Sequence, residues 1–174
     1  MTVRFTIQSG IDDETWQAYY QTLIQFHVHG TPVQQRLNIQ APETGKGDWV
    51  WGDQVQEVFV LSPGNPYSQL LPDMENIQRE AELVKLVRAS GINFENCVGM
   101  SPAGEWAERS LMLWNVDEKV VRDWGNRFEQ NAYFRLTPET FEVISLVDSR
   151  YHKSGWQSQL IESDEFEEDY LGTW

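Results

Sequence analysis

The chain has 174 residues, of which 40% are hydrophobic and 13% aromatic, as expected for one globular domain with a core rich in large rings. Its formal net charge is −14, because 27 acidic residues outnumber 13 basic ones. Such a charge repels phosphate groups, which excludes nucleic-acid binding through a basic face and docking on an anionic membrane. An acidic protein of this kind binds basic partners or simply stays in solution.

Cysteine usage and the lack of long apolar runs predict a cytoplasmic location. Cys97 is the only cysteine, so an internal disulfide is impossible and a reducing compartment is expected. No apolar run in the sequence has the length needed to cross a membrane. The opening residues, MTVRFTIQSG, lack the pattern of a signal peptide.

The first third of the chain alternates apolar and polar residues in a way that predicts short strands. These predicted strands cover residues 3–7, 22–30 and 35–39. Between the first two, Asp12 or Asp13 can cap a short helix that carries Tyr19 and Tyr20. Residues 41–54 contain one Pro and three Gly and are expected to form a long loop.

Residues 58–87 predict a buried strand, a loop rich in Pro, Gly and Asn, and an amphipathic helix. Asp73 is a suitable N-cap for this helix, and Gly91 a suitable residue to end it. Apolar residues at helical spacing predict the face that packs on the core. They are Met74, Ile77, Ala81, Leu83, Val84 and Val87.

The second half predicts two antiparallel strand pairs separated by a helix. Residues 93–100 and 105–116 are joined by the turn Ser-Pro-Ala-Gly, and a second hairpin turns at Thr137-Pro138-Glu139. The overall order favours an α+β fold with a mainly antiparallel sheet and two or three helices packed on one face. We expect one globular domain over residues 1–147, followed by an acidic C-terminal tail over residues 148–174 that is mobile or docked.

The loop NPYS after the first buried strand brings polar groups to the mouth of an apolar layer. Asn65 is pushed toward extended geometry by the proline that follows, and presents its carboxamide, with the hydroxyl of Ser68 close by. These groups can orient a polar ligand near the N-terminus of the following helix. The alternative is that both side chains only satisfy backbone groups of the turn.

Asn76 and Glu80 are four residues apart on that helix and lie beside or within its apolar arc. A carboxylate that faces a sheet is costly unless it is paired or hydrated. Either the first turns of the helix overhang a polar cavity, or Glu80 meets an internal arginine. We expect Asn65 and Ser68 to lie near both residues.

The segment WAERS places Trp106, Glu108 and Ser110 on one face of a strand. Glu108 is suited to act as a general base or as an acceptor for a ligand, with Trp106 as a stacking wall. An exposed face with cross-strand pairs is the alternative.

Histidine and cysteine give no convincing metal site. His27 and His29 lie two apart on a predicted strand, but such a pair needs a further ligand, and His152 is the only other histidine. Cys97 has no histidine close in sequence and is better suited to be a small core residue than a nucleophile. We therefore predict no metal site.

Together these segments resemble a small bacterial family known only as a domain of unknown function, number 3293, over roughly residues 18–134. The resemblance begins at AYYQTLIQFHV, continues through NPYS, MENIQREAEL and WAERS, and ends at RFEQNAYF. It implies that eight residues match characteristic positions of the family. These are Asn65, Pro66, Ser68, Asn76, Trp106, Glu108, Ser110 and Gln130. The resemblance implies no activity, substrate or cofactor, and Glu129 stands where the family often has Gly.

Two functions of different classes are compatible with these features. The first is a pocket for a small polar ligand, nucleotide-like or sugar-like, in which Glu108 is the one candidate general base and an enzymatic activity is left open. Its ligand-binding candidates are Asn65, Ser68, Asn76, Trp106, Ser110 and Gln130. The second is an acidic interaction or regulatory protein whose charged surface and tail bind a basic protein partner. The sequence identifies no cofactor.

Overall fold

A computed structural model describes residues 10–28, 34–38 and 47–161 of the protein. The predicted strand over residues 3–7 and the side chain of His29 lie outside these residues. In the described part the chain forms three α-helices, nine strands and one short 3-10 helix. In chain order they are α1 (Asp13–Tyr20), β1 (Leu23–His27), β2 (Gln34–Asn38), β3 (Val58–Leu61), η1 (Pro66–Ser68), α2 (Asp73–Ala89), β4 (Asn93–Met100), β5 (Ala107–Trp114), α3 (Glu118–Arg127), β6 (Ala132–Leu136), β7 (Phe141–Ser145), β8 (Tyr151–Ser154) and β9 (Gln157–Ile161).

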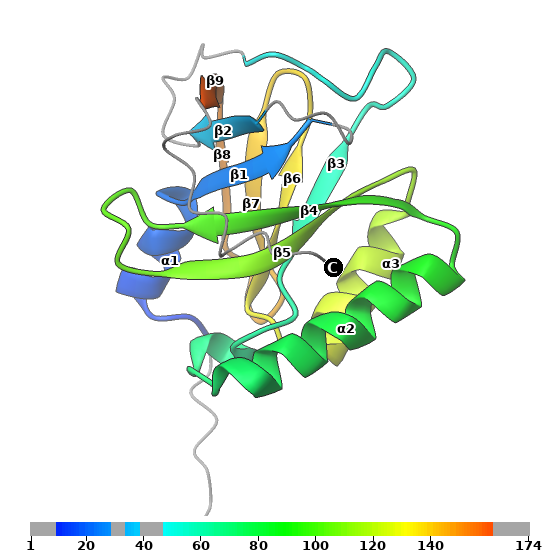
Figure 1. The fold of residues 1–174 in the computed structure, drawn as a ribbon. Helices are drawn as coiled ribbons and strands as arrows, with labels where there is room; N and C mark the ends of the chain where they lie inside the picture. Colours follow the sequence, from blue (N-terminus) through cyan, green and yellow to red (C-terminus); the bar gives the residue numbers. More distant parts are fainter. Residues whose placement is uncertain (1–9, 29–33, 39–46, 162–174) are drawn as a thin grey trace, which may run out of the picture.

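All nine strands belong to one sheet, in the order β8-β7-β6-β3-β5-β4-β1-β2-β9, and every neighbouring pair is antiparallel. The two edge strands, β8 and β9, are joined in the chain by only Gly155 and Trp156. The sheet therefore curls until its edges approach each other (Figure 1). Trp156 is fully buried at this closure, and its Nε1 donates to the Thr137 carbonyl oxygen at 2.9 Å.

The curled sheet separates two apolar cores. Successive residues of a strand point to opposite faces, so Val58 and Val60 enter the inner core while Phe59 and Leu61 enter the outer one. β5 divides in the same way, with Met112 inside and its neighbours Leu111 and Leu113 outside. Strand β3 is buried on both faces, which explains why its sequence is continuously apolar instead of alternating.

Helices α2 and α3 cover the outer face of the sheet, and α1 packs with its aromatic residues against the inner core (Figure 1). Leu83 and Val87 are the apolar residues that α2 buries. This arrangement confirms the predicted α+β class with a mainly antiparallel sheet. None of the described helices is both long and apolar enough to span a membrane.

The first turns of α2 differ from their prediction. Met74 and Ile77 were expected on the packed face, but they are 66% and 44% exposed, because this end of the helix extends past the apolar layer. The N-cap is Pro72, one residue before the predicted Asp73, and it provides no side-chain cap. The polar end of α2 thus lies beside the loop that follows β3.

The start of the predicted C-terminal tail is part of the sheet. Residues 148–161 contain β8, which pairs with β7, and β9, which pairs with β2. The side chains of β8 alternate between exposed and partly buried, so this edge strand has no apolar run in its sequence. Residues 162–174, including the acidic segment ESDEFEEDY, lie outside the described residues.

Candidate functional site

The loop after β3 has an unusual backbone. Asn65, Tyr67 and Ser68 all have left-handed conformations, with φ of 45°, 50° and 61°. Each such non-glycine residue costs of order 1–3 kcal/mol and persists only when the surroundings hold it in place. Here the Tyr67 amide donates to the Glu129 carbonyl oxygen at 2.7 Å, which ties the loop to the end of α3.

Asn65 is fixed by bonds to both its backbone and its side chain. Its backbone N–H donates to Asn76 Oδ1 at 2.9 Å, and its own Oδ1 accepts from Asn76 Nδ2 at 2.9 Å and from the Leu71 amide at 3.0 Å. Gly64 leaves little room for a side chain here, because an added Cβ would lie 3.0 Å from Asn76 Oδ1. The expected proximity of Asn65 and Asn76 is therefore a direct reciprocal contact.

The other end of the Asn65 carboxamide reaches Glu108 on β5. Asn65 Nδ2 donates to Glu108 Oε1 at 2.8 Å, while Oε2 accepts no hydrogen bond from any residue that the structure describes. Burial raises the pKa of the Glu108 carboxyl, and the hydrogen bond from Asn65 lowers it by a smaller amount. A carboxyl with one fixed oxygen and a raised pKa is suited to proton transfer as a general acid or base.

Two cavities adjoin the Asn65–Glu108 pair, and both residues contribute to each lining. The larger, of about 250 Å³, lies between the loop, α2 and the start of β5. Its polar lining includes Asn65, Asp73, Asn76, Glu80, Glu108 and Arg109. The smaller, of about 50 Å³, lies on the inner side of the sheet and has room for about one or two water molecules. Its lining includes Tyr19, Ser68, Trp106, Ser110 and Gln130.

Ser68 is part of a different contact group from Asn76 and Glu80. Its hydroxyl is 2.8 Å from the Tyr19 hydroxyl and accepts from Asn131 Nδ2 at 3.0 Å. These bonds attach the loop to α1 and to the start of β6.

The remaining predicted residues line the smaller cavity or support the loop. Trp106 and Ser110 share the lining with Glu108, and the Ser110 hydroxyl donates to the Glu108 carbonyl at 3.5 Å. Gln130 is buried, and its Nε2 donates to the carbonyl oxygens of Gly64 and Phe128 at 2.8 and 2.9 Å. These contacts make Gln130 a support for the strained loop as well as a lining residue.

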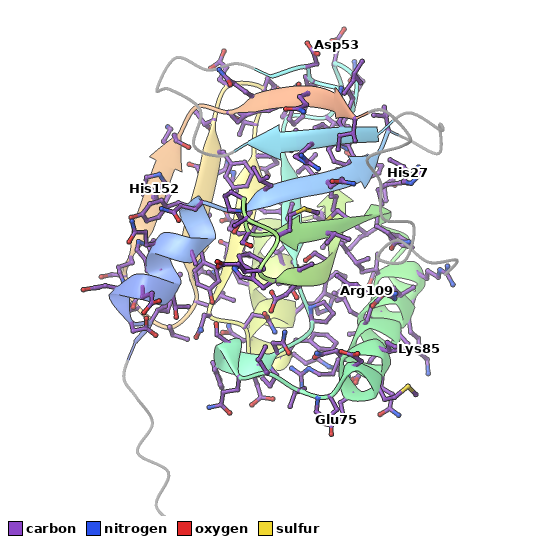
Figure 2. The ribbon with its side chains drawn as sticks, turned by 60° about the vertical axis from the view of Figure 1, so that its left-hand side comes forward. His27, Asp53, Glu75, Lys85, Arg109 and His152 are labelled. Atoms are coloured by element: carbon purple, nitrogen blue, oxygen red, sulfur yellow. The ribbon has the colours of Figure 1, made fainter. Side chains whose placement is uncertain are left out.

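Glu80 combines the two arrangements expected for it, because it meets an arginine and also lines the larger cavity. Its Oε2 lies 3.6 Å from Arg109 Nη1, and its side chain is almost completely buried. Figure 2 shows Arg109 between β5 and α2. Glu80 Oε1 is buried and has no hydrogen-bond partner within the described part of the chain. Burial raises the pKa of Glu80 to about 7, against a smaller opposing effect of Arg109.

The sequence analysis did not include several residues that shape the site. Tyr19 and Asn131 hold Ser68, Arg109 faces Glu80, and Arg79 donates to the Pro63 carbonyl oxygen at 2.7 Å. Tyr19, Arg79, Arg109 and Asn131 all lie inside segments that carry the family resemblance. The polar side chains of these residues, within those segments, are the feature of the sequence that could have identified them as site residues.

The described histidines do not converge on a metal site. Figure 2 shows His27 and His152 on opposite sides of the molecule. His152 stacks on Tyr20 with ring centroids 4.5 Å apart, and burial lowers its pKa. Among the described residues no group of three or more His, Cys, Asp or Glu side chains could hold a metal ion. Cys97 is buried in the inner core.

Comparison with known proteins places the site within a family segment. The model of a family described as "Protein of unknown function (DUF3293)" matches residues 61–133. This match confirms the resemblance for that part of the chain, which runs from the end of β3 into β6 and contains all seven candidate site residues. Searches of curated proteins and of solved structures found no match.

Proposed function

We propose that the protein binds a small polar ligand in the larger cavity, with Asn65 and Glu108 as its central contacts. The observation that carries this proposal is the hydrogen bond from Asn65 to Glu108 at the cavity wall, in a loop held in a strained conformation. Strained backbone is retained where the surroundings enforce it, and such places are enriched in binding sites. The scale of the cavity suits a ligand of metabolite size rather than a polymer.

The chemistry of the lining favours recognition over nucleophilic catalysis. Asn65 and Asn76 engage each other and fix a carboxamide next to a carboxyl group, an arrangement that can read hydroxyl or amide groups of a nucleotide-like or sugar-like ligand. Glu108 is the group suited to proton transfer, since burial raises its pKa and one oxygen remains without a partner among the described residues. An enzymatic activity would therefore use Glu108 as its general base. We take the protein to be bacterial and cytoplasmic as part of this proposal.

A thermal-denaturation screen against a metabolite library tests the proposal. Wild type is compared with Asn65→Ala, Glu108→Gln and the matched control Glu105→Gln, which removes the same charge from an exposed position nearby. A ligand at about 100 times its Kd stabilises the folded protein by ~2.7 kcal/mol. We expect at least one compound that stabilises wild type and Glu105→Gln but neither of the site variants, each measured against its own baseline.

The acidic interaction function is the competing outcome of this screen. If no compound stabilises wild type, and a basic protein is captured only when residues 160–174 are present, the pocket proposal is wrong and the second function replaces it. If a compound stabilises all four proteins equally, its binding site lies elsewhere.

A further inference from the structure

The larger cavity contains more acidic than basic side chains. Its lining has three carboxyl groups, on Asp73, Glu80 and Glu108, but only one guanidinium group, on Arg109. Asp73 is exposed to solvent, whereas Glu80 is 3% exposed and Glu108 is partly buried. Arg109 therefore cannot neutralise both inner carboxylates at once.

Glu80 also has an unsatisfied hydrogen-bonding atom. Oε2 faces Arg109, but Oε1 is buried, and the described residues supply no donor to it. Buried polar atoms are almost always hydrogen-bonded in folded proteins, so an exception at a cavity wall points to a missing partner. The unsatisfied Oε1 and the excess of carboxyl groups in the cavity thus both require the same kind of partner, a positively charged N–H donor.

On these observations, and on the ligand pocket proposed above, we infer that the cavity binds a small organic cation, a primary ammonium or guanidinium group that donates to the Glu80 carboxylate. The apolar lining residues Ile77, Pro63 and Ala107 suit the alkyl part of such a ligand. Asn65 and Asn76 are then the neutral groups that orient its remaining polar atoms. In this assignment Glu80 is the residue that makes the cavity specific for a positively charged ligand.

In the free protein, a proton on Glu80 takes the place of the ligand's charge below about pH 7. Burial raises the pKa of Glu80 to about 7 and raises that of Glu108, so both carboxyl groups hold protons more tightly than usual. A bound cation favours the ionised form of Glu80 and releases its proton. Other charged groups at this site are Asp73, Lys85 and Arg88 on α2 and Arg109 on β5, all of which line this cavity or the adjoining groove along α2.

This linkage gives the binding constant a pH dependence with a defined sign. A cation that requires ionised Glu80 binds more tightly as pH rises through about 7. An alkylamine keeps its own proton over this range, since amines of this type titrate near pH ~10. Between about pH 6 and pH 8 the dissociation constant should therefore fall about tenfold.

The test uses three probes of one length: butylammonium, butanol and butyrate. Binding to the full-length protein is followed by NMR through the side-chain amide signals of Asn65 and Asn76. The variants are Glu80→Gln and, as a matched control, Glu82→Gln. Glu82 lies on the same helix and pairs with an arginine, Arg127, at 2.7 Å, but it is exposed and outside the cavity. Both variants remove the same charge from the protein.

We expect butylammonium to shift both amide signals with a Kd of order 1 mM, while butanol and butyrate leave them unchanged. Glu80→Gln should weaken this binding at least tenfold at about pH 8 and remove the pH dependence, and Glu82→Gln should leave both unchanged. Binding of butanol or butyrate in place of butylammonium overturns the cation assignment but not the proposal of a ligand pocket. If none of the three probes binds, the cation assignment also fails, and the proposal of a ligand pocket is then tested by the metabolite screen alone. Equal loss of butylammonium binding in both variants assigns the effect to overall charge and likewise overturns the role of Glu80.

Discussion

At the scale of single residues, Glu80 has a carboxyl group of which only one oxygen, Oε2, has a partner among the residues that the structure describes. Arg109 lies 3.6 Å from Oε2, a long separation for an ion pair, and its side chain is itself 32% exposed. Removing a carboxylate from water disfavours its charged form, and one distant guanidinium does not offset that cost. The raised pKa of Glu80 is the expected result, with consequences for stability.

Replacing Glu80 by Gln should change how the free energy of unfolding depends on pH. The pKa of Glu80 is about 7 in the folded protein against an ordinary value of 4.5, so between these values the folded state binds more protons than the unfolded state. The contribution of Glu80 to stability is therefore present below about pH 4.5 and is lost as pH rises through 7. The loss is about 3 kcal/mol at most.

Urea unfolding at several pH values between 4 and 8 measures this effect. We expect Glu80→Gln to gain stability relative to wild type as pH rises across the window, and Glu82→Gln to follow the wild-type profile. If the free energy of unfolding depends on pH in the same way for wild type and Glu80→Gln, the Glu80 carboxyl is not in a desolvated environment.

The sequence predicted the central contacts of the site better than its periphery. Asn65, Asn76 and Glu108 lie in segments whose order matches the family resemblance, and polar residues next to apolar strands drew attention to them. The contact of Asn131 with Tyr19 joins positions 112 apart, and neither residue interrupts its local pattern. Local periodicity carries no information about such a pair, so only the folded sheet reveals it.

At the scale of secondary-structure elements, Trp156 is the residue that joins the two edges of the sheet. Its ring is fully buried in the inner core, and Gly47 packs so closely on it that any added Cβ would overlap the ring. Its Nε1 donates to the Thr137 carbonyl oxygen in the turn between β6 and β7. A single side chain from the β8–β9 connection therefore contacts the loop before β3 and the β6–β7 turn.

Truncating Trp156 should destabilise the protein strongly. Trp156→Ala leaves a large cavity and an unpaired carbonyl, at a cost of about 3–5 kcal/mol, whereas Trp156→Phe keeps most of the ring and loses about 1–3 kcal/mol with the hydrogen bond. Leu160→Ala is the control, because Leu160 lies on the neighbouring β9 but is 64% exposed, and its loss should be within about 0.5 kcal/mol. Chemical denaturation measures all three, and similar losses for Trp156→Ala and Leu160→Ala would contradict this role.

Edge strands explain the main difference between the predicted and observed elements. β3, β4 and the β6–β7 hairpin were predicted because apolar runs and Pro or Gly turns mark their ends. The sequence YHKS of β8 has no such run, because an edge strand needs to bury little. Its place in the sheet depends on pairing with β7 and on the buried Trp156 that follows.

At the scale of the whole molecule, the curled sheet brings segments from both halves of the chain to one site. The loop after β3 is joined by hydrogen bonds to α1, α2, β5 and the α3–β6 connection. Strands β8 and β9 line neither cavity, but they complete the sheet on which the site is built. We therefore expect the integrity of the sheet to decide where the chain can be shortened.

A chain that ends at residue 161 should fold, and one that ends at residue 147 should not. The first keeps all nine strands, whereas the second loses β8, β9 and Trp156. Circular dichroism and thermal denaturation distinguish the two: we expect a cooperative transition within a few degrees of wild type for the longer chain, and none for the shorter. A cooperative wild-type transition in the shorter chain would show that residues 148–161 are dispensable.

The most direct test of the proposed pocket is a ¹³C NMR titration of the Glu108 carboxyl group, in the free protein and with a compound that stabilises wild type. The site geometry predicts that Glu108 titrates above the ordinary carboxyl value of 4.5 in the free protein, because burial raises its pKa, and that the bound compound shifts this titration. A carboxyl that titrates at its ordinary value and does not respond to the compound would contradict the proposal that Glu108 is at the centre of a ligand site.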